Sequence, residues 1–447
     1  MHSSIDLLKY AAEVSLTLEL IIKNNNRISL AKRIGVEWST WASLALVAAL
    51  MEGGVLGVII KNAFQGQVSD WLLNICVAIA TGAPFFSNLS SFFWVRLSHG
   101  RSKAKLVSNL AILFCLCTFA MAFVSFTDLG LIIFISILIL ARVLWSGILT
   151  IRSNIWRANY PRHIRGKVTA KLATLAALVM SVAGISTGWV LDWQFGYFRW
   201  IFIGFALLSL IGAFRYRSLA VRHQDKEIHR EKNSQQKRSA IKMFSLLVEN
   251  KSFGKYMLAM FILGSGNLMF MAPLIVFLNE YTSMQQLEQI LITTAIPLSL
   301  IPVAVNWWAK LLDSNHIFHF RSIHSWVFVG ALGTFLLAQL TAIEELYYVG
   351  SIIYGVAFAG GVIGWNLGHN DFVGKAADNP MDYMAIHVTL TGIRGLLTPI
   401  VGITLYQWLE AGSLGLGQYA LLLPLAMTTL GAVLFTVFNR QNLEVHS

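Results

Sequence analysis

Residues 129–151 read LGLIIFISILILARVLWSGILTI, and this stretch decides the fold. Its apolar run has the length that an α-helix needs to cross about 30 Å of hydrocarbon. Eleven further stretches of similar length precede and follow it. The twelve predicted spans are residues 38–60, 71–95, 106–126, 129–151, 168–191, 198–216, 256–279, 287–309, 323–343, 346–367, 386–409 and 418–438. Hydrophobic residues make up 56% of the chain and charged residues 13%, which would leave too little polar surface for a soluble domain.

The basic residues gather in every second loop. One side of the predicted membrane protein carries nearly all of them, including Lys103, Arg321 and a cluster within residues 215–255, whereas the opposite side has only Lys61 and Arg199. By the positive-inside rule the basic side is cytoplasmic, which predicts a multi-pass protein of the inner (plasma) membrane with both termini inside. The net charge of +12 does not indicate a nucleic-acid partner, because these charges lie in short loops beside the anionic headgroups of the lipid bilayer.

A long charged segment divides the chain into two halves. We predict a cytoplasmic N-terminal segment (1–37), a six-helix bundle (38–216), a cytoplasmic linker (217–255), a second six-helix bundle (256–438) and a cytoplasmic tail (439–447). A weak internal repeat supports this division, because the second predicted span of each half ends on a similar sequence, at Trp94 and at Trp308. The predicted fold class is therefore an all-α integral membrane protein of twelve transmembrane helices in two bundles.

Residues 94–103, WVRLSHGRSK, carry a family resemblance. They resemble the basic loop-2 signature of the major facilitator superfamily of secondary transporters, and the resemblance extends over nearly the whole chain from residue 26. Gly100, Arg101 and Lys103 occupy matching positions, but the residue three before the glycine, which is acidic in that family, is Leu97. The equivalent loop of the second half keeps an acid, Asp313.

Two spans extend this resemblance. Arg142 is similar in placement to the arginine of the family's fourth helix, and Gly184 with Gly188 resembles a degenerate antiporter motif without its proline. In the family, helices 1, 4, 7 and 10 rock during alternating access, so the glycine-rich span 346–367 is a candidate hinge. The resemblance implies gating roles for Gly100, Arg101, Lys103, Asp313, Gly184, Gly188 and Gly361.

Ionisable side chains inside the spans identify a candidate binding site. Each costs about 2.5–3.5 kcal/mol to insert, so such residues tend to face a cavity. The segment Gly264-Ser265-Gly266-Asn267 predicts an interruption near the middle of the seventh helix. Non-helical backbone in the middle of the membrane is tolerated where it lines a cavity. The candidate substrate-binding or coupling residues are Glu52, Arg142, Asn267, Trp365, Asn366, Thr391 and Arg394.

These features predict a secondary active transporter that moves a small-molecule substrate by alternating access, as a symporter or an antiporter. Arg142 and Arg394 are predicted to lie deep in the membrane with one acid, Glu52, and this excess of positive charge favours an anionic solute. It fits equally a gate in which an arginine pairs with Glu52 in one conformation and leaves it free to take up a proton in the other. The alternative is a transporter-like sensor or assembly factor that moves nothing. We expect a monomer without a cofactor or metal, and no enzyme, since no catalytic cluster or metal-ligand spacing lies at one membrane depth.

Overall fold

The computed structural model describes residues 25–233, 244–373, 380–411 and 415–446, which form helices joined by short loops. Parts of the predicted N-terminal segment (1–24) and linker (234–243) lie outside the described residues. The helices of the first half are α2 (Asn25–Leu50), α3 (Gly53–Phe64), α4 (Asp70–Phe86), η1 (Ser87–Ser90), α5 (Ser91–Ser98), α6 (Lys103–Met121), α7 (Asp128–Asn159), α8 (Arg162–Trp193), η2 (Phe195–Tyr197) and α9 (Phe198–Tyr216).

The second half follows two short helices, α10 (Gln224–Asn233) and α12 (Leu246–Glu249). Its helices are α13 (Lys251–Met269), α14 (Met271–Tyr281), α15 (Gln286–Ile290), the π-helical turn η3 (Leu291–Ala295), α16 (Ile296–Asp313), α17 (Ile317–Thr341), α18 (Glu345–Leu367), η4 (Gly368–Phe372), α19 (Pro380–Ala411), η5 (Leu416–Tyr419) and α20 (Leu422–His446). In the described residues, eleven helical segments are long and apolar enough to cross a membrane, and the bent pair α2–α3 would be a twelfth. The predicted all-helical membrane fold is confirmed.

The first span is broken where the sequence predicts a continuous helix over residues 38–60. Helix α2 ends at Leu50, and α3 begins at Gly53 after a 42° bend. Glu52, at the N-cap of α3, has extended backbone angles (φ −65°, ψ 138°). Gly53 lets the chain approach α4 closely just after the break, because a Cβ atom there would lie 2.7 Å from the Thr81 Cα of α4.

The predicted interruption of the seventh helix at residues 264–267 is wrong. Helix α13 continues to Met269, and the break falls at Phe270, ahead of α14. Gly264 and Gly266 serve another purpose, since a Cβ atom on either would collide with a neighbouring helix, at Arg394 of α19 and at Thr428 of α20 respectively. These glycines allow helices to approach each other.

The internal repeat is present as a repeated contact between helices. The Trp94 indole donates a hydrogen bond to the Val143 carbonyl of α7 at 3.0 Å, and its ring covers Gly147, where a Cβ atom would lie 2.7 Å away. The second half repeats the donor, the acceptor and the glycine four residues later at Trp308, Val356 and Gly360. Helix α5 therefore packs on α7 in the same way as α16 packs on α18.

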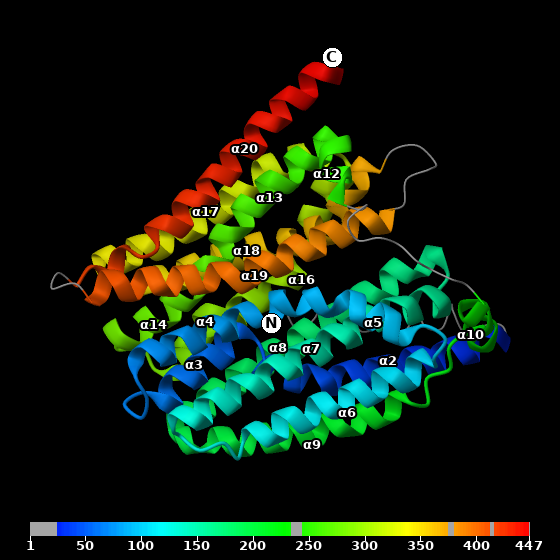
Figure 1. Cartoon of the computed structure of the whole chain (residues 1–447), viewed down its shortest axis with the longest axis horizontal. Coiled ribbons are helices and arrows are strands. Elements are labelled where there is room, and N and C mark those ends of the chain that lie inside the picture. Colours follow the sequence, from blue (N-terminus) through cyan, green and yellow to red (C-terminus); the bar gives the residue numbers. More distant parts are fainter. Residues whose placement is uncertain (1–24, 234–243, 374–379, 412–414, 447) are drawn as a thin grey trace, which may run out of the picture.

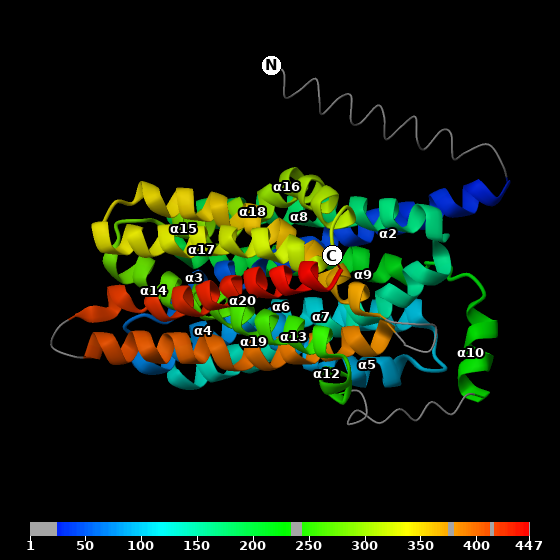
Figure 2. The same ribbon diagram turned by 90° about the horizontal axis from the view of Figure 1, so that it is seen from above.

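The two bundles lie side by side and meet most closely at one end (Figure 1). We call this the outer end, because it carries Lys61 and few other basic residues. There α3 packs on α14, while α4 runs along α19 and α8 contacts α15 and α16. The ribbons of the two halves come together at the left of Figure 1 and spread apart toward α5, α10 and α12 at the right, which we call the inner end. Figure 2 shows α10 standing across the inner end of the first half.

Candidate functional site

A cavity of about 80 Å³ lies between the two halves beside the break in the first span. It is large enough for a few water molecules. Residues of both halves line it: Glu52, Gly53, Gly54, Thr81, Pro84, Phe85, Asn267, Leu268, Met271, Thr293, Thr294, Pro297, Leu298, Tyr354 and Phe358. The cavity lies beside the break between α2 and α3 and close to Phe270, where α13 ends and α14 begins, and such breaks are tolerated where the backbone lines a cavity.

Glu52 and Arg142 form an ion pair at this cavity. Arg142 Nη2 lies 3.3 Å from Glu52 Oε1, and the side chains are 2% and 30% exposed, respectively. The Glu52 carboxylate is thus partly accessible, whereas its cationic partner is enclosed between helices. Because Arg142 is enclosed, Glu52 is the group that balances its charge in this conformation.

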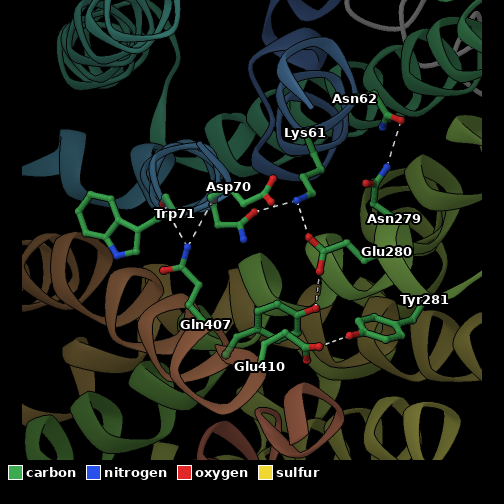
Figure 3. Close-up of polar contacts among 11 residues, drawn as sticks. Lys61, Asn62, Asp70, Trp71, Asn279, Glu280, Tyr281, Gln407 and Glu410 are labelled. Atoms are coloured by element: carbon green, nitrogen blue, oxygen red, sulfur yellow. Dashed lines mark hydrogen bonds and ion pairs between the residues drawn. The ribbon is translucent and has the colours of Figure 1, made fainter. Parts of the chain in front are cut away.

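A second ion pair joins the halves at the outer end (Figure 3). Lys61 of α3 lies with its Nζ 2.6 Å from Glu280 Oε1 of α14, and the same nitrogen donates to Asn74 Oδ1 at 3.0 Å. The other oxygen of Glu280 accepts a hydrogen bond from the Tyr406 hydroxyl of α19 at 2.7 Å. The Lys61 side chain is only 1% exposed, so its charge is enclosed among partners contributed by both halves.

Further hydrogen bonds close the outer end around this ion pair. Asn279 Nδ2 donates to Asn62 Oδ1 at 3.1 Å, and the Gln407 amide reaches the Trp71 carbonyl at 3.1 Å (Figure 3). On the opposite side of the seam, the Leu287 amide donates to Asp192 at 3.1 Å. Each of these contacts crosses between the halves, so this conformation is closed at the outer end.

Six of the seven predicted substrate-binding or coupling residues fall into two groups. Glu52 and Asn267 line the cavity, and Arg142 pairs with Glu52 there. Asn267 Oδ1 accepts a hydrogen bond from Thr428 Oγ1 at 3.4 Å. The second group lies within the second half and consists of Trp365, Thr391 and Arg394. Trp365 Nε1 and Arg394 Nη2 both donate to Thr391 Oγ1, at 3.3 and 3.2 Å.

Asn366 belongs to neither group, because its exposed amide donates to the Val362 carbonyl of its own helix at 2.7 Å. Among the predicted gating residues, Arg101 and Asp313 are exposed. Gly188 allows α8 to approach α15, since a Cβ atom there would lie 2.7 Å from Leu287 Cα, while Gly184 and Gly361 have more space.

Helix α10 supplies the acid that the loop-2 signature lacks at Leu97. Gly100, in the left-handed region at φ 66°, donates its amide to Glu231 Oε2 at 2.9 Å, and Lys103 Nζ lies 2.8 Å from Glu231 Oε1. Partial burial acts to raise the pKa of Glu231, but the hydrogen bonds from Lys103 and the Gly100 amide outweigh it, so the pKa lies below its ordinary value. Sequence reasoning missed this contact because about 130 residues separate the partners.

Other buried polar groups were also missed. Glu37, one residue before the first predicted span, is fully buried and accepts hydrogen bonds from Trp41 and Tyr216, so Glu52 is not the only enclosed carboxylate. Arg321, which the charge count assigned to a cytoplasmic loop, is 2% exposed within α17. The available signal was its spacing of three residues from His324, which places both on one helix face.

The described residues contain no group of three or more His, Cys, Asp or Glu that could hold a metal ion.

Comparison with known proteins defines the class of this two-bundle fold. Residues 41–379 match the family model of the Major Facilitator Superfamily. The chain belongs to the Major Facilitator Superfamily and is a secondary transporter, not an enzyme. No curated protein matches its sequence.

Solved structures share the fold at low sequence identity. A point mutant of the nucleoside transporter NupG aligns with a TM-score of 0.68 and 14% identity, over 91% of this chain and 99% of that one. A D-xylose-proton symporter aligns with the same TM-score and identity, over 90% and 96%. An inward-open xylose transporter XylE from E. coli aligns with a TM-score of 0.64 and 13% identity, over 91% and 95%. These likenesses establish the architecture of the chain.

Proposed function

We propose that this transporter moves a small solute with a negatively charged group by alternating access, and that Glu52 couples the movement to protons. The observation that carries the proposal is the position of Glu52. Its carboxylate lies at a helix break, on the wall of the cavity between the halves, against the enclosed guanidinium of Arg142. An acid in that position changes its surroundings whenever the two halves move relative to each other.

The chemistry of coupling follows from the ion pair. In the conformation described, Glu52 is paired with Arg142. Rocking of the halves would separate the two side chains, and Glu52 would exchange a proton as this pair breaks and forms again. One proton would then cross per cycle. The anionic character of the solute is supported by Arg394, which forms no ion pair within the described residues.

The substitution Glu52→Gln tests this proposal in proteoliposomes. A panel of labelled mono- and dicarboxylates, including lactate, succinate and glutamate, would first identify a transported solute. Because glutamine mimics the protonated acid, we expect exchange between two filled compartments to continue within about twofold of wild type, while accumulation driven by a pH gradient falls at least tenfold. Glu345→Gln is the matched control, since Glu345 is exposed at the start of α18.

Two results would count against the proposal. If Glu52→Gln still accumulates solute under a pH gradient, Glu52 is not the proton carrier. If the wild-type protein transports none of the anions, the charge class of the solute is wrong.

A further inference from the structure

The inner end of the second half encloses a group of cationic and imidazole side chains that we call the inner cluster. Its members are Arg321 of α17, His369 of η4, and His387 and Arg394 of α19, each between 1% and 6% exposed. Their side chains include buried nitrogens without a well-formed hydrogen bond: Arg321 Nε and Nη2, His369 Nδ1, both ring nitrogens of His387, and Arg394 Nε. The Arg321 guanidinium is within reach of the Tyr256 hydroxyl. Buried polar groups are nearly always hydrogen-bonded, so this concentration of unused nitrogens requires an explanation.

The charges of the inner cluster are also unbalanced. Elsewhere in the described chain, the enclosed cations Arg142 and Lys61 each pair with a carboxylate. Neither Arg321 nor Arg394 has an ion pair among the described residues. Asp371, in η4, is exposed and accepts a hydrogen bond from the Ile317 amide at 2.7 Å. Enclosing two guanidinium groups without a counter-charge is costly, and a bound anion would offset that cost.

The cationic groups converge around Tyr256 of α13. The Tyr256 hydroxyl donates to the Gly364 carbonyl at 3.4 Å, and Gly364 is where the Arg321 guanidinium packs, since a Cβ atom there would lie 2.6 Å from Arg321 Nη2. The His387 ring centre lies 6.3 Å from that of Tyr256. Arg394 lies near both the Tyr256 phenol and the Arg321 guanidinium.

Arg394 is held in place by two acceptors. It donates to the Met260 carbonyl of α13 and, at 3.2 Å, to Thr391 Oγ1. Its Nε remains without an acceptor. The rings of Phe253, Phe318 and Phe372 belong with Tyr256 to one buried core and keep the dielectric low beside the cluster, which strengthens any contact with an anion.

We propose that the inner cluster binds the carboxylate or phosphate group of a small anion, with Arg321 and Arg394 as its ligands and His387 as an additional donor. The proposal rests on the anionic solute proposed above and assigns that group to residues of the second half. Guanidinium groups suit it because they present several N–H donors in a planar fork that matches carboxylate and phosphate oxygens. The half-buried Trp365, 5.5 Å from the His387 ring, borders the cluster and provides an optical probe.

Titration of the full-length protein tests the inner cluster directly. The protein, in nanodiscs of phosphatidylcholine, would be titrated with inorganic phosphate and with succinate at constant ionic strength, following tryptophan fluorescence and melting temperature. We expect saturable binding that weakens at least tenfold in Arg321→Gln and in Arg394→Gln, equivalent to about 1.4 kcal/mol. Arg321→Lys retains the charge and should bind with intermediate affinity. Arg199→Gln is the matched control, because Arg199 contacts Phe126 and the Val124 carbonyl in the first half.

Several outcomes would overturn the assignment. One is the absence of saturable binding of either anion to the wild type, and another is unchanged affinity in a monodisperse, helical Arg321→Gln or Arg321→Lys variant. A third is binding of a lipid headgroup to the inner cluster: phosphatidylglycerol in the nanodisc would then raise the melting temperature and abolish the binding of phosphate. If the anions bind but are not transported in proteoliposomes, the anion site stands and the proposed function fails. If transport occurs with an unchanged KM in Arg321→Gln, the proposed function stands and the inner cluster is not the substrate site.

Discussion

At the residue scale, the enclosed charges of this chain fall into two kinds. Arg142 and Lys61 have carboxylate partners across a helix interface, at Glu52 and Glu280. Arg321, by contrast, has the neighbouring His324 ring at 3.2 Å and no ion pair among the described residues. A paired charge stabilises one arrangement of helices, whereas an enclosed charge without a partner favours a ligand. We therefore expect the paired residues to stabilise particular conformations, and Arg321 to bind the solute.

The Lys61–Glu280 ion pair gives a prediction at the same scale. We expect Lys61→Glu or Glu280→Lys alone to place like charges between the halves, open the outer end and reduce transport at least tenfold, because an unmatched buried charge costs about 3–5 kcal/mol. The double variant with exchanged charges should recover at least a third of the wild-type rate. Uptake and thiol labelling of a cysteine at Asn279 would measure both effects. Equal activity in single and double variants would show that the pair does not control opening.

At the element scale, α10 contacts the loop that follows α5. Beyond the contacts of Glu231 with Gly100 and Lys103, Ser102 Oγ donates to Gln224 at the first residue of α10, 3.0 Å away. Both ends of α10 therefore contact the loop that carries the loop-2 signature. Since the loop lacks its own acid at Leu97, the position of this loop depends on the linker.

The prediction for this element is that Glu231→Gln releases α10. Glutamine keeps the hydrogen-bonding shape but loses the charge that pairs with Lys103, so the amides of α10 and of Gly100 should exchange hydrogen at least fivefold faster in mass spectrometry. Gln224→Glu, at the other end of the helix, adds a charge instead of removing one and serves as a comparison. Unchanged exchange in Glu231→Gln would mean that apolar packing alone holds the linker.

The sequence predicted helices better than it predicted their breaks. Apolar length identified the spans because crossing a bilayer demands it, and the repeat at Trp94 and Trp308 proved to be a real shared contact. The break at Glu52 was missed because Gly53 and its neighbours keep the run apolar. Gly264 was misassigned as a break because sequence cannot distinguish a glycine that ends a helix from one that admits a neighbouring side chain. The burial of Arg321 was missed because it depends on helices far apart in the chain: the spacing from His324 shows that the two residues share a helix face, but not that this face is buried.

At the scale of the whole molecule, the charge distribution predicts the orientation in the membrane. Reporter fusions after residue 217, within residues 233–237 and at residue 447 should report the cytoplasm, and fusions after residues 62 and 344 the opposite side. The reason is that basic residues near span ends are retained on the cytoplasmic side during insertion. Alkaline phosphatase and green fluorescent protein, which are active on opposite sides, give complementary readouts. An external reporter near residue 235 would contradict the twelve-span topology.

Alternating access makes a final prediction about the molecule as a whole. The structure is closed at the outer end, where the side chains of Asn62 and Asn279 meet across the halves at 3.1 Å (Figure 3). If the halves must separate there in every cycle, joining Asn62→Cys to Asn279→Cys with a short bifunctional thiol reagent that can be cleaved by reduction should reduce uptake at least tenfold. Reduction of the linkage should restore it. Each single-cysteine variant controls for reaction at the native Cys117, which is only partly buried. Full uptake by the cross-linked protein would show that this end need not open, and that the closed seam is a permanent part of the fold.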